Sequence, residues 1–329
     1  MLSKEVSSIT SFSNLNDWYT VASSRFRFPE EPSGLYQAVN HIMNMKGKRI
    51  RPVLLIMGCE AFGGDVSNAL SPAYGIEVFH NFTLVHDDIM DEAHLRRGEP
   101  TVHQAYGLNT ALLAGDVMMM FAYRFISDVP QPFIKPLLDL FNRTATQVME
   151  GQQMDMEFEK KLKVNEGEYL TMIAYKTSVL LAAALQMGAI IGGADESDQQ
   201  NIYEFGLKLG LAFQIKDDYL DAYGDERTGK RKGGDILQNK KTFLVIAALQ
   251  NANMDDIQRY QNCLHESDSD KKVNKMLQFF ADRQVPALVE DRMNQLYLES
   301  LASLDKLSID AIHKDSLRQM ASMIYHREY

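Results

Sequence analysis

Two copies of one acidic pentad, Asp-Asp-x-x-Asp, constrain the fold of this chain more than any other feature. The copies occupy residues 87–91 and 217–221, and each lies within an apolar run. If those runs are helical, the first and last carboxylates of each pentad are four residues apart and share one face. Like charges at that spacing repel, so the fold must supply positive charge nearby. Two facing rows of carboxylates would hold several hard cations, and oxygen ligands indicate magnesium or calcium.

A phosphorylated substrate follows from the expected metal, because magnesium usually completes its coordination sphere with water and substrate phosphate. Basic residues accompany both pentads, namely Lys46, Lys48, Arg49, Arg51, Arg96, Arg97, Lys176, Lys230, Lys240 and Lys241. Guanidinium groups grip phosphate oxygens through paired hydrogen bonds, and lysine adds a point charge. One diphosphate held through metal ions and another held by arginine and lysine alone would make two different diphosphate substrates.

The composition argues against several other classes of protein. The chain has 329 residues and a formal net charge of -10, which disfavours a nucleic-acid binder and a basic membrane-binding patch. Cys59 and Cys263 form no disulfide framework, so we predict a reducing, cytoplasmic location. Residues 1–16 lack the apolar core of a secretory signal, and the apolar stretch 179–191 is too short to cross a bilayer. We therefore expect a soluble protein with no transmembrane segment.

Apolar residues recur at helical spacing nearly everywhere and strand-like alternation is scarce, so we predict an all-α fold. Pro52 and Pro72 fit the first turns of helices. No linker rich in Pro, Gly or Ser divides the chain, which favours one large helical domain over residues 1–329. The predicted helices cover 33–45, 51–62, 72–91, 109–127, 131–159, 166–175, 178–191, 198–223, 241–250, 254–264, 270–281 and 286–325.

One long polar segment, residues 224–239, interrupts the middle of the chain and directly follows the second pentad. It is rich in glycine and lysine. Beside a metal site, such a segment is typical of a lid that closes over an anionic substrate. The alternative is a flexible, solvated connection between two helices.

Several motifs occur in a fixed order along the chain. They are Gly-Lys-Arg-x-Arg-Pro at 47–52, Leu-x-His-Asp-Asp-x-x-Asp at 84–91, Leu-Arg-Arg-Gly at 95–98, Gly-Asp at 115–116, Lys-Thr at 176–177 and Gln-x-x-Asp-Asp-x-x-Asp at 214–221. From about Tyr36 to the C-terminus the chain resembles the trans-isoprenyl diphosphate synthases, the head-to-tail prenyltransferases; residues 1–30 match weakly. The resemblance implies a helical bundle of the isoprenoid synthase type, an active-site cavity between its central helices, and a homodimer.

The resemblance also implies a role for each pentad carboxylate. Asp87, Asp91 and Asp217 would ligate up to three Mg²⁺ ions together with an allylic diphosphate. Asp88, Asp218 and Asp221 would hold water or support those ligands, and Asp88 is placed with the catalytic group.

The two diphosphate sites follow from the same resemblance. Arg96, Lys176 and Lys230 would grip the allylic diphosphate as it leaves, and Lys240 would lie near it. The residues that would bind isopentenyl diphosphate are Lys48, Arg51, His80 and Arg97. Gln214 and the Thr177 region would face the developing carbocation with oxygen dipoles. The allylic C–O bond would ionise, the double bond of isopentenyl diphosphate would attack, and the departed diphosphate would remove a proton, so no protein nucleophile is needed.

The product length should depend on the first bulky side chain below the first pentad. Phe82 lies five residues before Asp87, which is roughly 7–8 Å along a helix. Related long-chain synthases have a small residue at this position, and animal-type fifteen-carbon synthases have a second aromatic where Thr83 stands. One aromatic without an insertion in the pentad matches archaeal-type twenty-carbon synthases. We predict geranylgeranyl diphosphate first, farnesyl diphosphate second and a longer chain third; Phe82 is either the floor or an ordinary packing residue.

Three other classes of protein remain as alternatives. A class I terpene cyclase is also helical and metal-dependent, but it would leave Lys48, Arg51 and Arg97 without a role. A non-catalytic partner subunit of another synthase has usually lost one aspartate motif, whereas both are intact here. A purely structural helical protein would gain nothing from two rows of carboxylates that repel one another.

Overall fold

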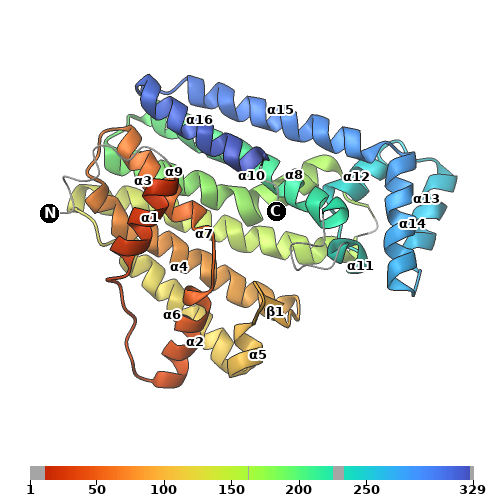
Figure 1. Ribbon diagram of the computed structural model, residues 1–329, viewed down its shortest axis with the longest axis horizontal. Helices are drawn as coiled ribbons and strands as arrows, with labels where there is room; N and C mark the ends of the chain where they lie inside the picture. Colours follow the sequence, from red (N-terminus) through yellow and green to blue (C-terminus); the bar gives the residue numbers. More distant parts are fainter. Residues whose placement is uncertain (1–11, 162, 225–232, 327–329) are drawn as a thin grey trace. The chain divides into compact units, whose positions relative to one another are not determined.

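The computed structural model describes residues 12–161, 163–224 and 233–326, and nearly all of its regular structure is helical (Figure 1). The predicted all-α fold is thereby confirmed, and a single two-stranded hairpin is the exception within the described ranges. The chain forms two compact units. Unit 1 comprises Met1–Asn142, Ala183–Ile202 and Leu307–Leu317, and unit 2 comprises Arg143–Ala182, Tyr203–Lys306 and Arg318–Tyr329. That residues 1–329 act as a single domain stays a prediction.

Unit 1 is built on helix α4, which carries the first pentad at its C-terminal end. Its complete elements are α1 (Phe12–Ser23), α2 (Ser33–Asn44), α3 (Ile50–Ala61), α4 (Val66–Met90), β1 (Leu95–Arg96), β2 (Glu99–Pro100), α5 (Val102–Tyr106) and α6 (Leu108–Ile126). Helix α4 packs against α3 and, over much of its length, against α6 (Figure 1). The hairpin follows α4 directly. Just after it, Thr101 donates from its backbone N–H to the His94 carbonyl and from its hydroxyl to the Ala93 carbonyl, which holds the two ends of the hairpin together.

Two glycines bring α3 into backbone contact with α9 (Val179–Gly192) inside unit 1. A Cβ atom at Gly188 would lie 2.0 Å from the Leu55 carbonyl oxygen, and one at Gly58 would lie 2.4 Å from the Leu185 carbonyl oxygen. Only glycine allows two helices to approach so closely. The side chains of Leu55 and Leu185 are fully buried beside this crossing, which anchors the core of the unit.

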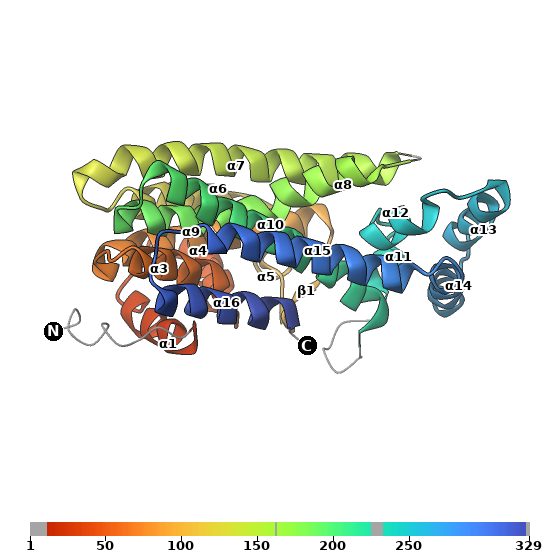
Figure 2. The ribbon, with the colours of Figure 1, turned by 90° about the horizontal axis from the view of Figure 1, so that it is seen from above.

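Unit 2 is built on α10 (Glu196–Tyr223), which carries the second pentad near its C-terminal end. Its further elements are α7 (Gln131–Lys160), α8 (Glu166–Ile173), the π-helix η2 (Ala174–Ser178), α11 (Gly234–Leu237), α12 (Phe243–Leu249), α13 (Met254–Leu264), α14 (Ser269–Asp282), α15 (Val285–Asp305) and α16 (Ala311–His326). Helices α7, α9, α10 and α16 contribute residues to both units. Helices α13 and α14 lie side by side (Figures 1 and 2). Tyr169, Phe243 and Phe279 belong to the buried core of the unit.

Two expectations for the first third of the chain were wrong. Helix α1 was not predicted, although Leu15 and Tyr19 are buried at helical spacing. Helix α4 begins at Val66 and not near Pro72, so this proline lies inside the helix. The start is set by Asp65, whose side chain accepts a 2.9 Å hydrogen bond from the Ser67 backbone N–H and caps the helix.

The predicted helix over 286–325 is two helices. It breaks after Asp305, and α16 begins at Ala311. In the break, Leu307 is buried, the Ser308 backbone N–H donates to Asp198 at 2.9 Å, and Asp310 accepts from the His313 backbone N–H at 2.9 Å. The capping carboxylate of Asp310 and the buried side chain of Leu307 therefore separate two helices within one continuous helical pattern of apolar residues.

One helical run has the length and composition of a membrane span. It covers Glu166–Gly192, which joins α8, η2 and α9, and 72% of its most apolar window is buried within the protein. This run is longer than the stretch 179–191 that the sequence analysis judged too short to cross a bilayer. Its length alone therefore does not exclude a membrane span. Its burial is that of a core helix, and it is weak evidence for a membrane segment.

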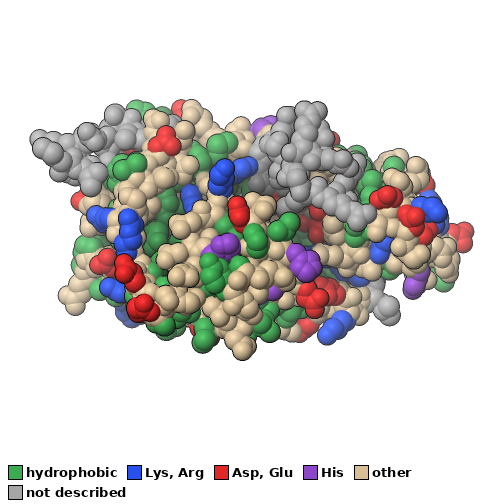
Figure 3. All heavy atoms as spheres, turned by 60° about the horizontal axis from the view of Figure 1, so that its bottom comes forward, with side chains coloured by type: hydrophobic (Ala, Val, Ile, Leu, Met, Phe, Trp, Pro, Cys, Tyr) green, Lys and Arg blue, Asp and Glu red, His purple; other side chains and the backbone are tan. Residues whose placement is uncertain are grey.

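The surface carries mixed charge. On the face drawn in Figure 3, Lys and Arg side chains lie singly or in small groups among acidic ones, and no broad basic patch gathers there among the described residues.

Candidate active site

The first pentad lies at the end of α4, where Arg96 offsets its charge. Asp88 is buried, and Arg96 from β1 holds it with Nε 2.9 Å from both carboxylate oxygens and a terminal nitrogen 2.7 Å from Oδ1. The same guanidinium lies 3.7 Å from Asp87. Carboxylates at a helix C-terminus oppose the helix dipole, so this partner is needed. Burial raises the pKa of Asp88, although Arg96 opposes the shift.

The second pentad lies on α10, and its middle carboxylate is held by neutral donors. Asp218 is buried and its Oδ2 accepts hydrogen bonds from the Tyr169 hydroxyl at 2.5 Å and the Phe243 backbone N–H at 3.0 Å. Its Oδ1 accepts from Gln214 Nε2 at 3.3 Å. Burial and then the nearby Asp235 raise the pKa of Asp218 to about 7, and the three hydrogen bonds oppose that rise.

Burial divides both pentads in the same way. Asp88 and Asp218 point inward, whereas the outer carboxylates are partly exposed, namely Asp87 and Asp91 in unit 1 and Asp217 and Asp221 in unit 2. Burial therefore sets Asp88 and Asp218 apart from the other four carboxylates. It does not separate Asp221, expected to be a supporting residue, from Asp87, Asp91 and Asp217, and the assignment of these three as ligands stays a prediction.

A cationic group in unit 1 contains Arg51, His80 and Arg97. A terminal nitrogen of Arg51 lies 3.2 Å from His80 Nε2, and its Nε is buried without a hydrogen-bond partner among the described residues. Burial lowers the pKa of Arg51 to about 10; Glu77 opposes this shift and Arg97 adds to it. Burial and then Arg51 hold the pKa of His80 well below its usual range, so this imidazole is neutral. A bound anion would relieve the repulsion within the group.

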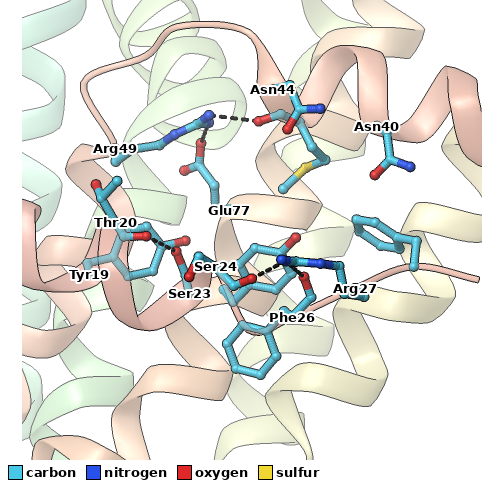
Figure 4. A pocket seen from close by; sticks show the side chains of 13 residues that line it. Tyr19, Thr20, Ser23, Ser24, Phe26, Arg27, Asn40, Asn44, Arg49 and Glu77 are labelled. Atoms are coloured by element: carbon cyan, nitrogen blue, oxygen red, sulfur yellow. Dashed lines mark hydrogen bonds and ion pairs between the residues drawn. The ribbon is translucent and has the colours of Figure 1, made fainter. Parts of the chain in front are cut away.

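Arg49 belongs to the same basic segment but has a structural partner. It lies in the left-handed conformation with φ of 48° and forms a 2.5 Å ion pair with the buried Glu77 (Figure 4). It also donates to the carbonyls of Met43 at 2.8 Å and Met45 at 3.0 Å. Arg49 therefore fixes the segment that carries Lys48 and Arg51.

The Arg49–Glu77 pair forms part of the wall of a cavity of about 440 Å³ in unit 1 (Figure 4). Residues from α1, α2, α4 and the segment after α1 line it, including Arg27, Asn40 and Asn44. Arg51 and His80 do not line it. It is thus separate from the cationic group that the sequence assigned to isopentenyl diphosphate.

A smaller cavity of about 110 Å³ in unit 2 brings together five residues that were given roles from the sequence, Lys176, Thr177, Gln214, Asp218 and Lys240. Lys176 and Thr177 lie on the π-helix, a form that often marks functional sites. The backbone of the π-helix packs tightly against α7, because a Cβ atom at Gly151 would lie 2.2 Å from the backbone nitrogen of Lys176. The ammonium of Lys176 lies 2.5 Å from Asp155.

The sequence reading missed Glu77, Asp155 and Tyr169, which hold predicted residues in place. A carboxylate three residues before His80 and a Gln-Gln-x-Asp run on a helix were the available signals. Lys230 and half of the proposed lid, residues 225–232, lie outside the described residues. Lys48 is exposed at the end of its loop.

Comparison with known proteins gives one consistent result. The polyprenyl synthetase family model matches residues 32–280. A geranylgeranyl pyrophosphate synthase of Geoglobus acetivorans is 44% identical over 223 residues, which are 67% of this chain and 70% of the relative. A short chain isoprenyl diphosphate synthase of Methanothermobacter thermautotrophicus is 38% identical over 306 residues, covering 91% and 92% of the two chains. A crystal structure of a geranylgeranyl pyrophosphate synthase matches with a TM-score of 0.92 at 39% identity, covering 97% of this chain and 99% of that chain.

Replacing Arg49 tests its structural role. Arg49→Met leaves the Glu77 carboxylate buried without its ion pair, so we expect a loss of about 3–5 kcal/mol in the free energy of unfolding, measured by chemical denaturation. Lys135 and Asp139 form a pair of the same 2.5 Å length on the surface, so Lys135→Met is the matched control. It should cost less than about 1 kcal/mol. Equal losses in the two variants would contradict the role assigned to Arg49.

Proposed function

Since the chain belongs to the polyprenyl synthetase family, whose members are trans-prenyltransferases, we propose that it joins isopentenyl diphosphate head to tail to an allylic diphosphate and makes geranylgeranyl diphosphate. The observation that carries this proposal is the cationic group of Arg51, His80 and Arg97, which is distinct from the pentad carboxylates. An enzyme that uses one diphosphate needs only the metal-binding carboxylates. A second, metal-free anion site implies a second diphosphate substrate.

The donor set fits magnesium as the metal. Asp87, Asp91 and Asp217 offer oxygen ligands from partly exposed side chains, which suits up to three Mg²⁺ ions. Among the described residues, no group of three or more His, Cys, Asp or Glu side chains is gathered closely enough to hold a metal ion alone. This is compatible with magnesium, which takes much of its shell from water and phosphate. The chemistry that magnesium supplies when bound is neutralisation of the charge on the leaving diphosphate.

The protein's own residues bind and orient the two substrates. Lys48, Arg51 and Arg97 hold isopentenyl diphosphate through charge-assisted hydrogen bonds, with the neutral His80 placed against Arg51. Arg96, Lys176, Lys230 and Lys240 act on the allylic diphosphate. Gln214 and Thr177 direct oxygen dipoles at the cation that forms when the C–O bond breaks.

A terpene cyclase is the main alternative, and it differs in one respect. It ionises one allylic diphosphate and has no second substrate, so the half-buried Arg51 and the neighbouring Arg97 would have no anion to bind. The geometry of unit 1 therefore favours the synthase. The proposed cytoplasmic location is supported by Cys59 and Cys263, which are both free and buried.

Product analysis is the direct test of the proposed reaction. The purified protein is incubated with Mg²⁺, labelled isopentenyl diphosphate and each of the five-, ten- and fifteen-carbon allylic diphosphates. We expect a twenty-carbon alcohol after dephosphorylation in all three cases, and no product when the metal is chelated. A cyclised hydrocarbon that forms without isopentenyl diphosphate would instead identify a cyclase.

Phe82 is the proposed floor of the product channel. It is buried on α4, with its ring centroid 5.6 Å from that of Phe79 and 4.9 Å from that of His86. His86 in turn fills a notch on α6, since a Cβ atom at Gly115 would lie 2.1 Å from its Nε2. Phe82 is therefore backed by a rigid contact between α4 and α6, as a blocking residue should be.

Shortening Phe82 should lengthen the product. Phe82→Ala, and the milder Phe82→Leu, remove the block, so we expect products beyond twenty carbons in the chain-length assay. Phe125→Ala is the matched control, because Phe125 has a similar exposure of 8% against 7% but lies in a cluster with Phe26 and Tyr74. Unchanged product length in both Phe82 variants would leave that residue as ordinary packing.

The proposed homodimer has a candidate surface on α6. Leu112, Leu113 and Met120 are 40%, 59% and 60% exposed on this helix, and exposed apolar side chains that gather on one element can mark an interaction surface. The family resemblance favours a second copy of this chain as the partner.

A charge placed on this surface should separate the subunits. We expect Leu113→Asp to shift the protein from dimer to monomer in light-scattering measurements, because the carboxylate would be desolvated in the interface. Leu298→Asp on α15 is the control, since Leu298 is 55% exposed and lies on another helix. A wild-type protein that is already monomeric would remove the proposal of a dimer.

A further inference from the structure

Four side chains of unit 2 form one chain of hydrogen bonds. The Tyr169 hydroxyl donates to Asp218 Oδ2 at 2.5 Å, Gln214 Nε2 donates to Asp218 Oδ1 at 3.3 Å, and the Thr177 hydroxyl donates to Gln214 Oε1 at 3.1 Å. Tyr169 comes from α8, Thr177 from the π-helix, and the other two from α10. Three elements thus share one polar network, which runs from the buried Tyr169 to the partly exposed Thr177.

The direction of each hydrogen bond in this network follows from the carboxylate of Asp218. In its ionised form, which the donors Tyr169, Phe243 and Gln214 favour, the Asp218 carboxylate can only accept hydrogen bonds, so Gln214 turns its NH₂ group toward it. The amide oxygen of Gln214 then faces Thr177. Because an amide oxygen can only accept, the Thr177 hydroxyl donates its single hydrogen to it. What Thr177 Oγ1 presents elsewhere is lone pairs alone.

We propose that Tyr169 is a positioning residue: through Asp218 and Gln214 it fixes the Thr177 hydroxyl so that only oxygen lone pairs face the allylic cation. Thr177 lines the same cavity as Lys176 and Gln214, where the proposed reaction develops positive charge. Lone pairs stabilise that charge, whereas a hydroxyl hydrogen turned into the cavity would oppose it. The inference rests on the proposed function, and it gives Asp218 a role as an anchor of this network.

Tyr169 is suited to this role by its environment. Its side chain is almost fully buried at 1% exposure, and its ring packs 5.9 Å from that of Phe243, whose backbone N–H donates to the same carboxylate oxygen. Two donors on Oδ2 leave Oδ1 for Gln214. Without the hydroxyl, the carboxylate can rotate, and both orientations of the amide become accessible.

The first test compares two buried tyrosines of unit 2. Tyr169→Phe removes one hydroxyl and keeps the ring, so the variant should fold and circular dichroism should match wild type. We expect kcat for condensation to fall on the order of tenfold, with an unchanged KM for isopentenyl diphosphate. Tyr260→Phe is the control, because its buried hydroxyl has no hydrogen-bond partner among the described residues. An unchanged kcat in Tyr169→Phe would overturn the proposal.

A double variant separates positioning from a general structural effect. If Tyr169 acts through Thr177, then Tyr169→Phe combined with Thr177→Val should have the same kcat as Thr177→Val alone. Losses that multiply would mean that Tyr169 acts by another route, and the proposal would be wrong. The combination of Tyr260→Phe with Thr177→Val should show no coupling.

A measurement without turnover keeps this inference separate from the proposed function. The Tyr169 hydroxyl proton should give a low-field proton NMR signal that Tyr169→Phe removes and Tyr260→Phe retains. If wild type makes no prenyl product, the proposed function fails while this signal still reports the hydrogen-bond network. If wild type is active and the signal is absent, only the positioning role fails.

Discussion

The burial of one carboxylate in each pentad is the constraint on which the surroundings of both pentads depend. An isolated buried carboxylate is costly, so Asp88 and Asp218 must each be surrounded by donors. The requirement shapes the chain beyond the pentads. The hairpin after α4 brings the Arg96 guanidinium to Asp88. The first residue of α12, Phe243, donates its backbone N–H to Asp218. The carboxylates on either side of Asp88 and Asp218 remain partly exposed.

Glycines at helix crossings bring these elements close enough to meet. Gly151 on α7 and Gly210 on α10 both face the π-helix, and a Cβ atom at Gly210 would lie 2.7 Å from Ser178 Cβ. The extra residue in the π-turn moves Lys176 and Thr177 off the regular helical register. The backbone contacts thus allow Thr177 to reach Gln214 and Lys176 to reach Asp155, which a straight helix packed at an ordinary distance would not permit.

The sequence predicted most helices and the chemical character of the site, because helical period and the repeated pentad are local signals. It did not separate the roles of neighbouring cations. Arg49 and Arg51 look alike in the sequence, yet the left-handed backbone at Arg49 turns its side chain to Glu77, whereas Arg51 meets His80. Tyr169 was missed for a related reason: its partner lies 49 residues away, and an aromatic on an apolar helix face reads as core.

The charged groups of the two units have different surroundings. Unit 1 gathers guanidinium groups, and burial lowers the pKa of Arg51 and of Arg97, so an anion is the ligand that would relieve their repulsion. In unit 2 the ammonium of Lys176 is already matched by Asp155, and the neighbouring Thr177 is held by neutral hydrogen bonds. A hydroxyl oxygen beside a neutralised lysine can face a cation without a strong opposing field. The proposed binding of isopentenyl diphosphate in unit 1 and the proposed stabilisation of a carbocation in unit 2 require such different surroundings.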